Sequence, residues 1–431
     1  MARDTNNFFD VIISGRGFVG HAQTLALLQA LGAGTRIALL DRAPAMTEAA
    51  STSKTPEIVR SNAYPDGGRA FAISAGTQRM LSVLGVWTDV EEAAQPVREI
   101  VLTDSSLDDS VRPQVMAYDN VLDQDEAASY IIQSDILEAV LRRRVEERTA
   151  DGDVVIVHDG EPVDLVRDDF AVSVVLANET TVRAPLVVSA EGRSSPLRKL
   201  AKIKLTSWGH DQTGIVTQVK HTRPHEARAV QHFLPSGPFA ILPLPGDRSC
   251  ITWSEANETA KKILALNDAD FLAEVQKRFG SQLGELELIG PRQSWPLETH
   301  IARFFVADRL ALVGDAAHGV HPIAGQGLNL GLRDVAALTE VVAEAARVGL
   351  DIGNGQTLAA YQQWRRFDSV VSTTAFDGLN RIFSNDAILA RALRDAGMGL
   401  LDRMPWAKKQ LVTNAAGLAG NVPKLLKGEL V

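Results

Sequence analysis

A glycine-rich turn near the N-terminus constrains the fold more than any other feature of the sequence. Residues 8–14 are typical of a strand, residues 21–31 are typical of an Ala- and Leu-rich helix, and three glycines in a GxGxxG spacing lie between them. These glycines are Gly15, Gly17 and Gly20. Residues 35–40 then form a second strand pattern that ends on Asp41, 21 residues after the last glycine. Glycines there let a diphosphate reach the helix N-terminus, and the acid accepts hydrogen bonds from a ribose, so the pattern predicts an adenine-dinucleotide site rather than a β–α turn without a ligand.

A second glycine-rich stretch, residues 309–334, repeats the strand–turn–helix pattern much later in the chain. It begins with an apolar run, breaks at a Gly–Asp pair that contains Asp315, and resumes as a helical pattern near Gly327. Its five glycines and Pro322 suit a backbone that passes close to a flat ligand, because side chains would block the approach. An ordinary capped helix would explain Asp315 and one glycine, but not the whole run.

Composition excludes several classes of function. The 431 residues carry 44 Lys plus Arg against 53 Asp plus Glu, a net charge of −9, which argues against a nucleic-acid partner. The single cysteine, Cys250, excludes an internal disulfide framework and favours a reducing compartment. His318 and His321 are three residues apart but lack further residues at ligand spacing, so we expect no metal. No signal region opens the chain and no window approaches the ~18 apolar residues of a spanning helix, so we expect neither export nor a membrane span.

The stretch 309–334 resembles the second flavin motif of the aromatic-hydroxylase type of FAD monooxygenase. The resemblance implies that Asp315 holds the ribitol hydroxyls of FAD, for which a charged acceptor is well suited. It places three residues beside the flavin ring, and these are His321, Pro322 and Gly325. It also assigns to FAD the start of the following helix, namely Gln326, Gly327, Leu328 and Asn329. The N-terminus of that helix would stabilise the anion of reduced flavin, and no side chain is expected to act as the catalyst.

The same resemblance assigns three further residues to FAD. Arg69 follows a loop rich in Ser, Thr and Pro and takes the place of an arginine near the flavin and its pyrophosphate; a surface arginine paired with an acid is the alternative. Gln133 precedes a predicted helix and takes the place of a polar side chain against the flavin. Glu191 opens a segment similar to the family's strand-DGxxSxxR motif, which serves FAD and the nicotinamide donor, and replaces the usual Asp. The matching positions are Gly192, Ser195 and Arg198.

The resemblance covers nearly the whole chain and implies its architecture. The segments RAFAIS, FAILPLPGDRSCITW and GDAAHGVHPIAGQGLNLGLRD are similar to the UbiH-type ubiquinone-biosynthesis hydroxylases, within the para-hydroxybenzoate-hydroxylase fold class. The expected fold class is α/β: a Rossmann-like FAD-binding domain with an inserted antiparallel β-sheet substrate domain and C-terminal helices. The three parts are assigned to residues 1–75, 129–205 and 300–345, residues 76–128 and 206–299, and residues 346–431, respectively. A small meander is predicted at residues 154–157, 163–167 and 171–176.

By this resemblance the protein is an FAD-dependent monooxygenase of ubiquinone biosynthesis. It would hydroxylate the ring of a polyprenyl phenol with NAD(P)H and O2, through a flavin hydroperoxide. Two alternatives stay open: an FAD oxidoreductase that acts without oxygen insertion, such as a dehydrogenase or prenyl reductase, and a catalytically silent subunit of a quinone-biosynthesis complex. The first would not need the proline- and glycine-rich passage beside the flavin. Intact Asp41 and Asp315 argue against the second.

The C-terminal region has the pattern of an interfacial helix. Apolar residues recur at helical spacing over residues 382–431, and residues 402–429 hold five basic residues against two acids. The basic residues are Arg403, Lys408, Lys409, Lys424 and Lys427. Such a pattern favours anionic lipid, so we expect a cytoplasmic protein in peripheral contact with the inner face of the cytoplasmic membrane, or with other quinone-biosynthesis proteins. The alternative is a terminal helix that packs on its own domain or on a second subunit.

Overall fold

The computed structural model describes residues 7–43, 68–104, 107, 114–320, 325–383 and 404–431. Its first sheet has six strands in the order β18-β19-β12-β1-β2-β8, and all neighbours are parallel except β18 and β19. The strands are β1 (Val11–Ser14), β2 (Ile37–Leu40), β8 (Val154–Val157), β12 (Leu186–Ser189), β18 (Val306–Ala307) and β19 (Leu310–Leu312). The apolar residues of its central strands are buried, as expected for a parallel sheet covered on both faces.

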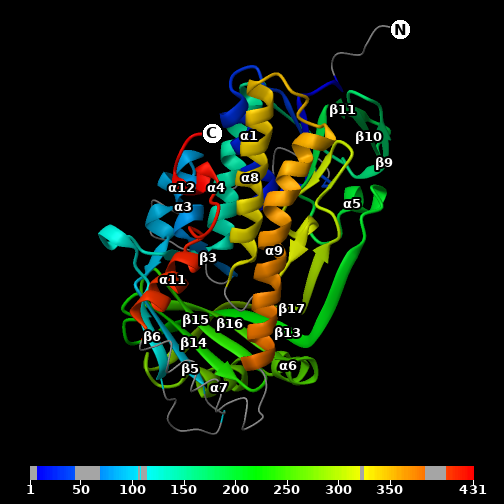
Figure 1. Cartoon of the computed structure of the whole chain (residues 1–431). Coiled ribbons are helices and arrows are strands. Elements are labelled where there is room, and N and C mark those ends of the chain that lie inside the picture. The colour runs from blue at the N-terminus through cyan, green and yellow to red at the C-terminus, as the bar shows by residue number, and fades with distance from the viewer. Residues whose placement is uncertain (1–6, 44–67, 105–106, 108–113, 321–324, 384–403) are drawn as a thin grey trace.

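Helices connect these strands and cover the sheet. Helix α1 (Phe18–Leu31) connects β1 to β2, and α4 (Ser134–Ala150) leads into β8. Helix α1 packs against both α4 and α8 (Gly327–Arg347) (Figure 1). Strands β2 and β12 lie on opposite sides of β1, so the strand order reverses there. In open α/β sheets ligands bind outside the carboxyl ends of the strands at such a reversal, which places the expected cofactor at the end of β1.

The second sheet has eight strands in the order β20-β17-β13-β16-β15-β14-β5-β6 and lies below the helices in Figure 1. Its strands are β5 (Glu99–Asp104), β6 (Gln114–Asp119), β13 (Leu205–His221), β14 (Arg228–Leu234), β15 (Gly237–Leu244), β16 (Arg248–Ala256), β17 (Leu286–Ala302) and β20 (His318–Gly319). One face packs on α6 (Asn257–Leu264) and α7 (Asp268–Phe279) through buried Trp253 and Phe271. The sheet is antiparallel as predicted, except that β14 and β5 run parallel because they come from separate segments that no hairpin joins.

Two smaller three-stranded sheets complete the β-structure. One contains β3 (Ala70–Ser74), β7 (Ser129–Gln133) and β4 (Gln95–Val97). The other is a meander of β9 (Pro162–Arg167), β10 (Val172–Leu176) and β11 (Thr181–Ala184). The sequence-based assignment of residues 154–157 to this meander was wrong, because β8 pairs in parallel with β2. The crossover through α4 returns the chain to the parallel sheet, and the next hairpin strands then form the meander.

Two segments at the boundaries of the predicted domains pack with a different part of the protein from the one to which they were assigned. Residues 76–128 were assigned to the substrate domain, but Met80 and Leu81 of α3 (Ala75–Val83) lie in the same hydrophobic core as the parallel sheet. Residues 300–345 were assigned to the FAD domain, but the end of β17 and β20 pair within the eight-stranded sheet. The division as a whole stays a prediction.

The C-terminal residues pack against the chain that carries them. After α9 (Gly355–Phe383), the next described helices are α11 (Pro405–Ala415) and α12 (Lys424–Lys427). Their apolar residues Val412, Leu425 and Leu426 are buried, and Arg333 of α8 donates hydrogen bonds to the carbonyls of Gly417 and Ala419. Within the described residues, no helix combines the length and the apolar character that crossing a membrane requires.

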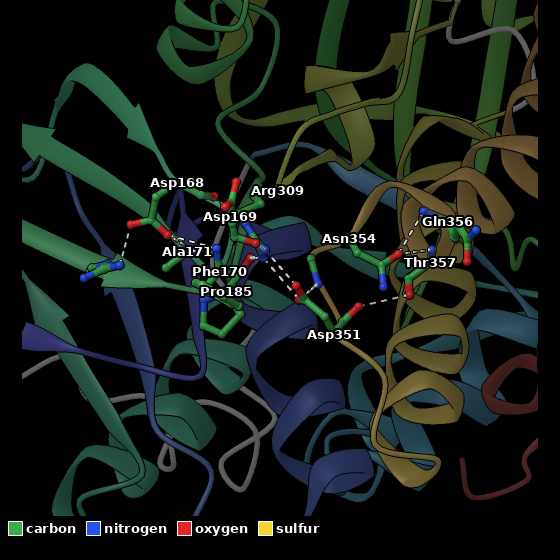
Figure 2. A network of polar contacts seen from close by, with 12 residues as sticks. Asp168, Asp169, Phe170, Ala171, Pro185, Arg309, Asp351, Asn354, Gln356 and Thr357 are labelled. Carbon is green, nitrogen blue, oxygen red and sulfur yellow. Dashed lines mark hydrogen bonds and ion pairs between the residues drawn. The ribbon is translucent and has the colours of Figure 1, made fainter.

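A buried arginine holds the opposite edge of the parallel sheet, where the strands begin. Arg309 precedes β19, is 3% exposed and has a left-handed φ of 55°. Its guanidinium donates to the carbonyls of Pro185 (3.0 Å), Asp168 (3.2 Å) and Asp169, and to both carboxylate oxygens of Asp351 (Figure 2). The Asp351 hydrogen bonds raise the pKa of Arg309. This cluster, the Arg309 clamp, joins the meander, the start of β12 and the α8–α9 connection.

Candidate cofactor site

The turn between β1 and α1 leaves an open helix N-terminus. A Cβ on Gly20 would lie 1.8 Å from the carbonyl oxygen of Gly15, and a Cβ on Gly15 would lie 2.4 Å from that of Ala190, so neither position accepts a side chain. Gly17 is the N-cap, and no described atom lies within 4 Å of the position its Cβ would take. Within the described residues no side chain caps this helix. Its free N–H groups therefore fit the diphosphate of an adenine dinucleotide.

Asp41 lies directly after β2, where the ribose acceptor was predicted, and it already has partners. Its Oδ2 accepts a hydrogen bond from Nη1 of Arg16 at 2.8 Å, and its Oδ1 accepts one from the backbone N–H of Ala43 at 3.0 Å. The side chains of Arg16 and Asp41 are each 16% exposed. Arg16 was not predicted from the sequence to belong to the site. A long side chain is least expected at its position, between two motif glycines.

Asp315 presents its carboxylate outward after β19. It lies in the single turn η6 (Gly314–Ala316) and is exposed. Two buried side chains hold the backbone of that turn: His300 donates from Nε2 to the Asp315 carbonyl at 2.9 Å, and Arg198 donates from Nη1 to the Ala316 carbonyl at 2.9 Å. Burial lowers the pKa of His300, so the ring is neutral near pH 7. The turn is thus fixed from behind while its carboxylate faces out, which fits the ribitol role.

A buried ionic cluster, the Asp334 cluster, lies beneath the same turn. Asp334 of α8 accepts hydrogen bonds from the backbone N–H of Gly314 (3.0 Å), Nε2 of His318 (2.6 Å) and Nε of Arg365 (2.7 Å). Asp334 and Arg365 are fully buried. Burial alone would raise the pKa of Asp334, but the charges of His318 and Arg365 outweigh it and lower that pKa. Arg365 was not predicted from the sequence. The signal that could have indicated a buried partner is Asp334, an acid within the apolar face of α8.

Few described atoms lie against the start of α8, and its predicted contacts with the flavin stay predictions. Gly325 has a φ of 61°, and a Cβ there would lie 3.2 Å from the Cβ of Ala72 on β3. At Gly327 a Cβ would meet no described atom closer than 4.0 Å. Gln326 takes the N-cap position. His321 and Pro322 lie outside the described residues.

Asn329 joins α8 to the three-stranded sheet of β3, β7 and β4. Its side-chain oxygen accepts from the backbone N–H of Ser74 at 3.0 Å, and its Nδ2 donates to the carbonyl of Ala72 at 2.7 Å. Leu328 is half-buried and packs against the large core. The side chain of Asn329 therefore continues the hydrogen bonding of β3, and FAD contacts by Leu328 and Asn329 stay predictions.

Glu191 turns its carboxylate into the protein. It is 7% exposed, and its Oε1 accepts from the hydroxyl of Ser14 at 2.7 Å. Its Oε2 accepts from the hydroxyls of Ser195 (2.6 Å) and Ser189 (3.0 Å) and from the backbone N–H of Leu197 (3.0 Å). The carboxylate thus ties β1 to β12 and the next helix at the switch point, and a direct contact with FAD stays a prediction.

Arg69 lies near the N-terminus of α1. It is exposed, and its guanidinium lies over the ring of Phe71 at 4.8 Å from the centroid. Phe71 in turn meets the ring of Phe18, the first residue of α1, edge-on at 5.1 Å. A cation therefore lies close to the predicted diphosphate position, and its partner among the described residues is the ring of Phe71.

Gln133 ends β7 and lies between the sheet of β3, β7 and β4 and the eight-stranded sheet. It is 2% exposed, and its Nε2 donates to Oε1 of Gln218 on β13 at 3.4 Å. Gln218 then donates to the carbonyl of Gly68 at 3.1 Å. The predicted residue thus lies in a buried amide chain that connects both sheets beside Arg69.

His21 is a buried histidine near the N-terminus of α1. It lies on α1 directly after Gly20, is 1% exposed, and neither ring nitrogen has a hydrogen-bond partner among the described residues. Burial, together with the charges of Arg16 and Arg142, lowers the pKa of His21 to about 3. The ring is therefore neutral in the folded protein at every ordinary pH.

We expect this histidine to destabilise the fold in acid. The unfolded chain binds a proton near pH 6.5 and the folded chain only near pH 3, so stability present above pH 6.5 is lost as the pH falls, by about 2–3 kcal/mol at pH 4.5. Urea unfolding between pH 7 and pH 4.5 should show a shallower loss for His21→Leu than for the wild type. Equal slopes in the two proteins would contradict the assignment.

Comparisons with known proteins agree with this geometry. A family model described as an FAD binding domain matches residues 9–367. The chain is 37% identical to the ubiquinone hydroxylase UbiL of Rhodospirillum rubrum, over 97% of this chain and 92% of that protein. It is 30% identical to the 3-demethoxyubiquinol 3-hydroxylase of Escherichia coli, over 96% of this chain and all of that protein. The p-nitrophenol 4-monooxygenase PnpA of Pseudomonas putida has the same fold, with a TM-score of 0.73 over 96% of this chain and 99% of that one at 18% identity.

An open helix N-terminus follows β1, and Asp41 and Asp315 follow β2 and β19 of the same sheet. Together with the family match, this arrangement defines a flavin-dependent oxidoreductase. The chain belongs to the family of FAD-binding-domain proteins. It is an FAD-dependent hydroxylase, and its own residues fit the cofactor: Gly17 leaves room for a diphosphate, and Asp315 is an exposed acceptor. The predicted fold class and the predicted cofactor are confirmed, whereas the individual contacts with FAD stay predictions.

Proposed function

We propose that this protein hydroxylates the aromatic ring of a polyprenyl phenol in ubiquinone biosynthesis, with NAD(P)H as reductant. The observation that carries this proposal is 37% identity to a ubiquinone hydroxylase along 97% of the chain, with the cofactor turns intact. FAD, when bound and reduced, supplies the reaction with O2 and the transfer of one oxygen atom to the ring. The side chains of this protein then need to bind, orient and exclude water.

A buried apolar cluster, which reaches the start of α8 through Ala72, supports an aromatic, hydrophobic substrate. Its buried residues come from the small sheet and the eight-stranded sheet, and they are Ala70, Val97, Ile131, Val216, Ala229, Leu244 and Cys250. Burial raises the pKa of Cys250 to about 12, so its thiol stays neutral and does not serve as a nucleophile. An uncharged, apolar cluster behind the start of α8 suits a neighbouring phenol ring with an apolar chain.

Asp315 gives the sharpest test of cofactor binding. We expect Asp315→Ala to raise the Kd for FAD by about tenfold or more, because charge-assisted hydrogen bonds contribute about 1.5–3 kcal/mol each. Titration followed by flavin fluorescence measures the change. Asp308→Ala removes another exposed carboxylate, at the opposite end of β19, and should leave the Kd unchanged. Equal Kd values for wild type and Asp315→Ala would remove the ribitol assignment.

The reaction itself is tested with a phenolic quinone precursor. The proposal requires coupled consumption of O2 and NAD(P)H and a product with one additional oxygen atom by mass spectrometry. Oxidation of the reductant with an unoxygenated product would favour the dehydrogenase or reductase alternative. FAD binding without turnover of any quinone precursor would favour the silent subunit.

We also propose that α11 makes the peripheral membrane contact. Trp406 and Leu411 are 70% and 39% exposed, and Lys409 lies between them in sequence. An exposed aromatic residue beside a basic residue suits an anionic lipid surface. The contact surface is narrower than the sequence indicated, because Val412 and Leu425 are buried and Lys424 pairs with Glu340.

Point variants test this contact better than truncation, which would expose the buried residues of the C-terminal region. We expect the double variant Trp406→Ser, Leu411→Ser to float less with anionic liposomes than the wild type at low salt. Leu430→Ser, which changes another exposed apolar residue, serves as the control and should float like the wild type. Undiminished flotation of the double variant would exclude α11 as the contact.

A further inference from the structure

Arg16 is a charged side chain at the centre of the dinucleotide motif, where the motif itself requires none. It lies between Gly15, whose φ is 114°, and Gly17, the N-cap of α1. A side chain at this position starts at the predicted diphosphate and extends along the carboxyl ends of the strands. Its partners therefore determine what the adenosine end of the site presents to a ligand.

The guanidinium of Arg16 bridges two elements around that end. Its Nη1 donates to Oδ2 of Asp41 at 2.8 Å, after β2, and its Nη2 donates to Oε1 of Glu146 on α4 at 3.2 Å. Glu146 is about half exposed at 49%, whereas Arg16 and Asp41 are each 16% exposed. The contact with Asp41 is thus the sheltered one, and it fixes the direction of that carboxylate together with the Ala43 N–H.

Two polar groups here keep unused hydrogen-bonding capacity. The Nε of Arg16 is buried and has no partner among the described residues, and the same holds for both ring nitrogens of His21. Buried polar atoms are normally paired, because an unpaired one costs about 1–3 kcal/mol. Protein atoms cover these nitrogens, so Arg16 is held in a sheltered position from which its outer nitrogens reach Asp41 and Glu146.

We propose that Arg16 is a specificity-determining residue that makes the site select FAD over flavin mononucleotide. It acts by holding the Asp41 carboxylate toward the ribose. Among the described residues, Arg16 bonds to Asp41 and Glu146 and not to Asp315. The inference rests on the FAD site described above and adds a division of labour: Arg16 and Asp41 bind the half that flavin mononucleotide lacks.

The test compares three ligands on the full-length protein freed of flavin. Arg16→Met, which keeps the length and removes the charge, should raise the Kd for FAD by about tenfold and weaken competition by ADP by a similar factor. The Kd for flavin mononucleotide should change by less than about twofold, since the lost contacts are those of the adenosine half. Arg42→Met is the matched control, because Arg42 is an exposed arginine beside Asp41.

Three results would overturn the inference. Equal weakening of FAD and flavin mononucleotide by Arg16→Met would make Arg16 a structural residue, and equal effects of Arg16→Met and Arg42→Met would reduce it to general charge attraction. Unchanged or tighter FAD binding would exclude a binding role. The double variant Arg16→Met, Asp41→Asn should lose less than the sum of the single losses, because one residue acts through the other. If Arg16→Met leaves FAD binding unchanged while Asp315→Ala still weakens FAD binding, the proposed function stands without this inference.

Discussion

Asp334→Ala is expected to destabilise the protein by about 3–5 kcal/mol, because it leaves the fully buried guanidinium of Arg365 without its buried partner. His318 and the backbone N–H of Gly314 lose the same acceptor. Urea unfolding measures the loss. Since Gly314 begins the turn that carries Asp315, we also expect a weaker affinity for FAD in the fraction that folds.

Asp368→Ala is the matched control for this prediction. Asp368 also pairs with Arg365, at 2.9 Å, but its side chain is 35% exposed. Solvent screens such a pair, so its loss should cost about 1 kcal/mol or less and leave the affinity for FAD unchanged. Similar losses for Asp334→Ala and Asp368→Ala would show that the Asp334 cluster does not hold the turn.

Arg309→Ala is expected to cost about 3–5 kcal/mol of stability with no change in the affinity for FAD. The substitution removes the donors to three backbone carbonyls and to Asp351 in the Arg309 clamp. Each hydrogen bond from the buried guanidinium contributes about 1.5–3 kcal/mol, and less where solvent reaches the acceptor, as at the exposed residues Asp168 and Asp169. The clamp lies at the edge where the parallel strands begin, so the cofactor edge should keep its geometry. Urea unfolding and FAD titration separate the two effects.

Arg183→Ala is the control for the Arg309 clamp. Arg183 pairs with the side chain of Asp168, whose backbone carbonyl Arg309 binds, but both partners are well exposed at 39% and 50%. Its loss should cost about 1 kcal/mol or less. If Arg309→Ala were equally mild, solvent would replace the guanidinium at the carbonyls of the clamp, and the Arg309 clamp would not hold this edge of the sheet.

The sequence predicted the local parts of the site well, because their constraints are local. The turn at Gly15 and Gly20 admits no Cβ, and a motif spacing reports that directly. The orientation of Glu191 was not predictable, since it depends on Ser14, which is 177 residues away in the sequence. A carboxylate that follows a strand has the same local pattern whether it turns toward a ligand or toward a hydroxyl.

Long-range pairing also explains the other gaps. The partner of Asp334, Arg365, lies on the next helix, 31 residues further on, and one arginine among many gives no signal of its own. Strand β8 has the short apolar pattern of its meander neighbours, and only the crossover through α4 places it beside β2. Periodicity identifies a strand, whereas its neighbour in the sheet depends on the connection that precedes it.

The hydrogen bonds between the two ends of the chain set the order in which this protein can mature during synthesis. The backbone N–H of Gly76, just after β3, donates to the carbonyl of Ala416 at 2.9 Å, and the Asp315 turn depends on Arg365 through Asp334. A nascent chain therefore exposes its β1–α1 unit long before the residues that complete the site have left the ribosome. FAD can therefore join a complete site only after Arg365 and Ala416 have been synthesised and have packed on the earlier residues.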